Sequence, residues 1–215
     1  MIRESGPRRR QGGLSFNACT KAFMKTFIPY WGYNSIMALP DFRLFYKKLK
    51  KEELVDALDF AVTRSHYLMA LWVGALLKKH SDAKELLKDI MRERGRNMAE
   101  QLMAELEPSI ALKRDAITWW ECYRRFIDPY IKSRIMGLKL LKLTPTLCKL
   151  RFTHCAFIKG WAYATITPEE MCEILKETER GLAEGINPGL ELTEFYPGLA
   201  RYEPYCQLTI TLSKR

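Results

Sequence analysis

The chain has six cysteines, but no two of them form a Cys-x-x-Cys pair. Their spacing fits neither a zinc ribbon nor the dense disulfide framework of a small secreted protein. The sequence also lacks the apolar stretch and small-residue cleavage site of a secretion signal after its N-terminal arginines. We therefore expect a cytoplasmic protein whose cysteines are free thiols.

Nucleic-acid-binding motifs are missing too, although the net charge is +10. Arginines cluster at residues 8–10 and lysines at residues 47–51, while the other basic side chains are interleaved with Glu and Asp. Such interleaving is typical of solvated helix faces rather than of a phosphate-binding patch. We expect a basic surface and no nucleic-acid partner.

The most apolar run, residues 68–77, is too short to cross a bilayer, which takes about 20 residues. His66 and Lys78 flank it. We expect a buried helix there and no membrane partner.

Residues 1–23 form a basic leader that we expect to be disordered, followed by a single α+β domain over residues 24–215. Three helices are expected, over residues 51–79, 81–107 and 114–134, because apolar residues recur every three to four positions. Pro129 should kink the third helix or end it early. The apolar stripe of the first helix consists of Leu54, Ala57, Leu58, Ala61, Val62, Leu68, Leu71, Trp72, Ala75 and Leu76.

After residue 134 the pattern changes, and residues 135–143 and 146–154 read as a hairpin around Thr144-Pro145. A helix continuing through Lys142 is the alternative. Thr167-Pro168-Glu169-Glu170 is a strong helix start, and Asn187-Pro188 stops that helix. Two more strands are expected over residues 190–195 and 205–212. The sequence thus predicts an α+β fold, with a helical N-terminal half packed on a small antiparallel sheet formed by the C-terminal hairpins.

Side chains capable of chemistry gather in residues 152–206. His154 and Cys155 are adjacent at a strand end, where neighbours face opposite ways, so they do not form a ready dyad. Glu179 falls at the edge of an apolar helix face, where a carboxylate is costly unless it is paired or serves a site. Core packing of the cysteines, and pairing of Glu179 with Lys176 or Arg180, are the alternatives.

A metal site could be drawn from these side chains, but no local ligand spacing fixes its geometry. We expect no cofactor, and a metal is left open. The residues in question are His154, Cys155, Cys172, Glu179 and Cys206.

Three features together resemble the L-2-amino-thiazoline-4-carboxylic acid hydrolase family. They are Phe152-Thr153-His154-Cys155, the Gly-Leu-Ala-Glu-Gly-Ile-Asn-Pro run at residues 181–188, and Cys206 in the last strand. The resemblance implies a hydrolase that cleaves a carbon–nitrogen bond in a small cyclic amidine or amide. It implies Cys155 as nucleophile, Glu179 as acid/base or amidine anchor, His154 as auxiliary base, and Asn187 as a positioning residue. The loop at residues 194–205 departs from the family pattern and leaves the substrate open.

The same strand–loop–strand ending is similar to the 4-vinyl-reductase small-molecule-binding domains, which bind apolar ligands without necessarily converting them. An aromatic pocket would suit either function, with core packing of the aromatics as the alternative; its expected lining is Trp119, Trp120, Tyr123, Phe157 and Trp161. A small molecule is the expected partner, and a homodimer or a structural partner protein is left open.

Overall fold

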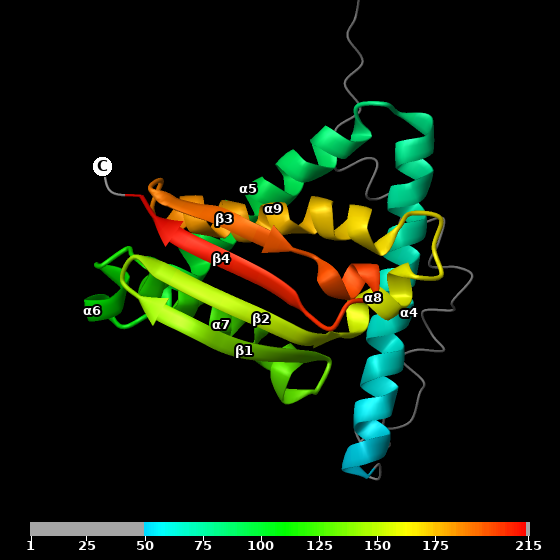
Figure 1. Ribbon diagram of the computed structural model, residues 1–215, viewed down its shortest axis with the longest axis horizontal. Coiled ribbons are helices and arrows are strands. Elements are labelled where there is room, and N and C mark those ends of the chain that lie inside the picture. Colours follow the sequence, from blue (N-terminus) through cyan, green and yellow to red (C-terminus); the bar gives the residue numbers. More distant parts are fainter. Residues whose placement is uncertain (1–49, 214–215) are drawn as a thin grey trace, which may run out of the picture. The chain divides into compact units, whose positions relative to one another are not determined.

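The computed structural model describes residues 50–213, which form helices on one face of a four-stranded antiparallel sheet (Figure 1). The expected α+β class is confirmed. The basic leader, residues 1–23, lies outside the described residues, as do residues 24–49 of the expected domain. The elements are α4 (Lys51–Lys79), α5 (Ala83–Ala104), α6 (Pro108–Ala111), α7 (Ala116–Lys132), β1 (Met136–Thr144), β2 (Leu147–Cys155), α8 (Ala156–Trp161), α9 (Pro168–Ile186), β3 (Leu190–Tyr196), η2 (Gly198–Arg201) and β4 (Cys206–Leu212).

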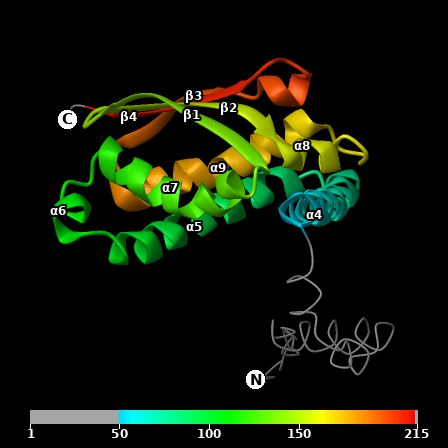
Figure 2. The same ribbon diagram turned by 90° about the horizontal axis from the view of Figure 1, so that it is seen from below.

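Both expected hairpins are present, and they join through β2 and β4 in the order β1-β2-β4-β3. The pairing of Lys142 with Lys149 in the first hairpin excludes a helix through residue 142. Leu150 of β2 pairs with Leu208 of β4, and both are buried. The sheet therefore turns one apolar face towards α7 and α9, which lie against it in Figure 2.

Helix α9 begins as its sequence predicts. The Thr167 hydroxyl accepts the Glu170 backbone N–H at 3.1 Å, and the Glu170 carboxylate accepts the Thr167 N–H at 3.3 Å. Pro168 fills the first turn, where its missing donor costs nothing. The helix runs to Ile186 and buries one apolar face, so both ends of the segment that carries Glu179 are fixed by local signals.

The expected buried face of α4 is wrong. Most residues of the expected stripe are exposed, Trp72 by 57%, and only Val62 and Leu71 are half-buried. Ala70 and Val73, on another face, are buried. Helix α8 determines which face is covered, because a Cβ at Gly160 would collide with the Thr63 carbonyl oxygen. Close backbone approach at Gly160, together with the apolar cluster that includes Ala70 and Val73, therefore selects the contact.

By length and composition alone, α4 could cross a membrane, and 17% of its most apolar window is buried. Core helices of soluble proteins pass the same test, so this is weak evidence. The expectation that residues 68–77 form a buried helix holds only for one face of α4, and the absence of a membrane partner stays a prediction.

Three further boundaries differ from expectation. Helix α7 continues through Pro129 to Lys132, so the proline does not end it. Helix α5 ends at Ala104, and Pro108 begins the short α6 instead of ending α5. Helix α8, directly after Cys155, has only six residues and was not expected.

Candidate functional site

Two adjoining cavities lie inside the molecule, one under the sheet and one among the helices. The sheet cavity, about 130 Å³, is lined from all four strands and from α7, α8 and α9. The helix cavity, about 240 Å³, is lined from α4, α5, α7, α8 and α9 and from the start of β1. Most of their lining is apolar or aromatic. Their shared wall consists of Tyr123, Met136, Phe157, Leu175 and Glu179.

Glu179 is the acidic side chain in this shared wall. Its Oε2 atom is buried and has no hydrogen-bond partner among residues 50–213. Burial raises the pKa of the Glu179 carboxyl to about 7, against the opposing effects of Arg94 and of a hydrogen bond with Tyr123. A buried carboxylate without a full set of partners is costly, so its retention indicates a site.

The two basic neighbours considered from the sequence are engaged elsewhere. Lys176 forms an ion pair with Glu173, and Arg180 donates to Glu177 at 2.6 Å. The alternative in which Glu179 is neutralised along its own helix is therefore wrong, and the side chain lies in the cavity wall.

Three free thiols line the sheet cavity: Cys155, Cys172 and Cys206. Cys155 is the N-cap residue of α8, where its sulfur makes no capping hydrogen bond but lies near the backbone N–H groups of Phe157 and Ile158. Those donors favour the thiolate, but burial outweighs them and raises the pKa of Cys155 to about 12. The thiol is therefore protonated at neutral pH, and a nucleophilic role for it stays a prediction.

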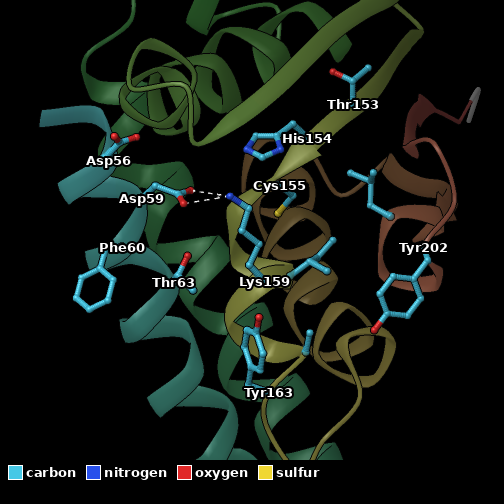
Figure 3. Close-up of a pocket in the computed structure, with 13 residues that line it drawn as sticks. Asp56, Asp59, Phe60, Thr63, Thr153, His154, Cys155, Lys159, Tyr163 and Tyr202 are labelled. Atoms are coloured by element: carbon cyan, nitrogen blue, oxygen red, sulfur yellow. Dashed lines mark hydrogen bonds and ion pairs between the residues drawn. The ribbon is translucent and has the colours of Figure 1, made fainter. Parts of the chain in front are cut away.

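His154 lies outside the two cavities, in a surface groove of about 610 Å³ between α4, α8 and η2. Figure 3 shows its ring and the Cys155 sulfur pointing to different sides of the strand end, as neighbours on a strand should. In the same groove Lys159 of α8 donates to Asp59 of α4 at 3.0 and 3.3 Å. Cys155 and Ile158 line both the groove and the sheet cavity, so they form the partition between them.

The other expected site residues divide into two groups. Tyr123 lines both cavities and Trp161 lines the sheet cavity, whereas Trp120 packs against the main core. Asn187 caps α9, where its amide donates to the Arg114 carbonyl at 2.8 Å and its oxygen accepts the Gly189 N–H at 2.9 Å. The structure thus brings Cys155, Glu179, Tyr123 and Trp161 together, and leaves His154, Trp120 and Asn187 outside the cavities.

His66 of α4 was missed by the sequence analysis, which treated it only as a polar flank of an apolar run. Its ring lines the helix cavity and stacks on Phe157, with centroids 3.8 Å apart and planes 16° apart. Burial lowers the pKa of His66 to about 4. It lies one helical turn before the buried Ala70, but the sequence carries no signal that marks this face of α4 as the covered one.

Within residues 50–213, no group of three or more His, Cys, Asp or Glu side chains is arranged to hold a metal ion.

Neither a protein-family model nor a curated protein matches the chain. One solved structure with a similar arrangement is a trafficking protein particle complex subunit 3 from Naegleria fowleri, covalently bound to palmitic acid. The two are 13% identical, with a TM-score of 0.46, over 70% of this chain and 96% of that chain. A likeness at this level carries no argument about what the chain binds or does.

Proposed function

We propose that the chain binds a small, largely apolar molecule in the sheet and helix cavities, with Glu179 as its polar anchor. The observation that carries the proposal is the buried Oε2 atom of Glu179, which lacks a partner among residues 50–213 and lies in the shared wall of both cavities. Leaving a buried polar group unpaired costs about 1–3 kcal/mol or more. A bound molecule that hydrogen-bonds to this oxygen removes that cost.

The wall around Glu179 indicates what such a molecule looks like. The shared residues Tyr123, Met136, Phe157 and Leu175 offer apolar and aromatic surface. The pKa of about 7 lets the Glu179 carboxyl accept from a cationic or neutral N–H when ionised, and donate when protonated. We therefore expect an apolar body with one polar group, rather than a highly charged metabolite.

A fluorescent probe tests the proposal directly. N-phenyl-1-naphthylamine has two aromatic groups and one N–H, and its emission rises in apolar sites. We expect saturable binding to the wild type and about tenfold weaker binding to Glu179→Leu, because a hydrogen bond to a carboxylate is lost. Glu169→Leu is the matched control, since Glu169 pairs with Arg201 away from both cavities. Equal probe affinity in wild type and Glu179→Leu, or no binding at all, refutes the proposal.

Hydrolysis of a carbon–nitrogen bond in a small cyclic amidine or amide is the second candidate. One observation favours it: a carboxyl group with a pKa of about 7 is suited to general acid–base catalysis at neutral pH, and Cys155 lines the same cavity. We expect Glu179→Gln and Cys155→Ser each to abolish turnover of 2-amino-thiazoline-4-carboxylate. Unchanged turnover in both variants rules out this mechanism.

We also propose that the chain works in the cytoplasm. The five cysteines among the described residues are free, which suits a reducing compartment.

A further inference from the structure

Two more aromatic side chains around the cavities have a buried polar atom without a partner among residues 50–213. They are His66, through Nδ1, and Trp161, through Nε1. His66 lines the helix cavity and Trp161 lines the sheet cavity. With Glu179, the two cavities are therefore surrounded by three polar groups that nothing in the described part of the chain satisfies.

These two rings are held firmly by their neighbours. His66 is stacked on Phe157, and the Trp161 ring meets the His66 ring edge-on, with centroids 5.6 Å apart at 65°. Tyr130 also meets the Phe157 ring edge-on, with centroids 5.4 Å apart. Rings locked in this way hold their polar atoms in one arrangement, which lowers the entropy lost when a partner binds.

The chemistry of the three groups is complementary. An indole N–H can only donate, so Trp161 needs an acceptor. An ionised Glu179 can only accept, so it needs a donor. His66 is neutral at pH 7, because burial lowers its pKa to about 4, and it can serve either kind of group. The walls between them are aromatic, from Tyr123, Phe126, Tyr130 and Phe157.

We infer that His66 and Trp161 form a second polar anchor, and that the ligand is a flat aromatic molecule carrying both a hydrogen-bond donor and a separate acceptor. Glu179 accepts from the donor, Trp161 donates to the acceptor, and the aromatic walls enclose the ring system. This inference rests on the proposed function and adds the ligand's chemical class and two residues that select it.

Three naphthalenes test separately whether the ligand needs a hydrogen-bond donor and whether it needs an acceptor. 6-Acetyl-2-naphthol carries a donor and an acceptor, 2-naphthol lacks the carbonyl acceptor, and 2-acetylnaphthalene lacks the donor. By calorimetry with the wild type, we expect 6-acetyl-2-naphthol to bind about tenfold more tightly than either relative, which corresponds to one hydrogen bond each.

Matched variants test which residues cause the tighter binding of 6-acetyl-2-naphthol. Trp161→Phe should abolish the advantage of 6-acetyl-2-naphthol over 2-naphthol. Trp119→Phe should keep it, because the Trp119 Nε1 atom also lacks a partner among residues 50–213 but lies in the main core. His66→Phe preserves a ring against Phe157. This variant should bind 6-acetyl-2-naphthol more weakly and bind 2-methylnaphthalene, which has no polar group, as tightly as the wild type does. If Trp161→Phe does not fold, His66→Phe takes its place as the test.

The outcomes separate the inference from the proposed function. Equal affinity for the three naphthalenes, or the same selectivity in Trp119→Phe and Trp161→Phe, overturns the inference alone, provided that N-phenyl-1-naphthylamine still binds in a Glu179-dependent way. Loss of that dependence overturns the proposed function itself.

Discussion

Replacing Glu179 by Gln should stabilise the protein, and the gain should grow with pH. Burial raises the pKa of this carboxyl from the ordinary 4.5 to about 7 in the folded state. Between these values the folded state binds the proton more tightly than the unfolded state, so wild-type stability from this group is present at low pH and lost as pH rises through 7. A difference of about 2.5, at about 1.4 kcal/mol for each pKa unit, corresponds to about 3 kcal/mol.

Urea unfolding of both proteins between about pH 5 and pH 8 measures this effect. The amide introduced by Glu179→Gln has nearly the shape of the carboxyl group and keeps an acceptor for the Tyr123 hydroxyl, but it does not ionise. The stability difference, variant minus wild type, should be small near pH 5 and approach about 3 kcal/mol near pH 8.

The test compares the stability difference between variant and wild type, because the pH dependence of wild-type stability alone contains contributions from other groups. The pKa of His66 is lowered from 6.5 to about 4, so its contribution to stability rises with pH between those values and opposes that of Glu179. Both proteins contain His66, so its own contribution cancels in the difference. The effects of Arg94 and Glu177 on the Glu179 carboxyl do not cancel, but they are already included in its pKa of about 7. A difference that does not change with pH, or a Glu179→Gln variant that is less stable than wild type at pH 8, would refute the argument that burial of the Glu179 carboxylate, with its Oε2 atom unpartnered, destabilises the folded state.

The other predictions concern the thiols and the frame of the site. Cys155 should react slowly with iodoacetamide at pH 7.5 in the native protein and rapidly after unfolding, as followed by mass spectrometry, because burial raises its pKa to about 12; fast native labelling contradicts this. Gly181→Ala should lower stability by about 1–3 kcal/mol or more in urea unfolding, because its Cβ would collide with the Arg92 carbonyl. Gly189→Ala should change stability little, because its nearest contacts lie 3.4 Å away. Thr167→Ala should cost about 1 kcal/mol in the same assay, because α9 loses its N-terminal cap.

Those parts of the fold that rest on local signals could be predicted from the sequence. The capping box at Thr167 placed the start of α9 correctly, and the Asn187-Pro188 stop placed its end within about one turn. The alternation of Cys148 and Leu150 with polar neighbours identified a strand, and both residues are fully buried. The place of Glu179 beside the core followed from its position on the apolar edge of the same helix.

What could not be predicted depends on contacts between distant segments. The covered face of α4 is selected by close approach to Gly160, about a hundred residues later, and a helix that is apolar on several sides gives no local sign of this. The same contact turns His66 inward, which is why this residue was not recognised. Helix α8 is too short for a 3.6-residue period to be visible, so the N-cap position of Cys155 was hidden as well.

The strand order has a consequence for how the chain reaches this structure. Strand β4 follows every other described element in the sequence, yet it lies between β2 and β3. Until it is synthesised, β2 and β3 each leave a backbone edge unpaired, and the wall contributed by Cys206 and Leu208 is missing from the sheet cavity. Long-range strand pairing of this kind is slow and leaves intermediates prone to aggregation. A molecule bound in the sheet cavity would therefore meet a complete wall only after β4 has inserted, and it would stabilise the finished sheet rather than the intermediates that precede it.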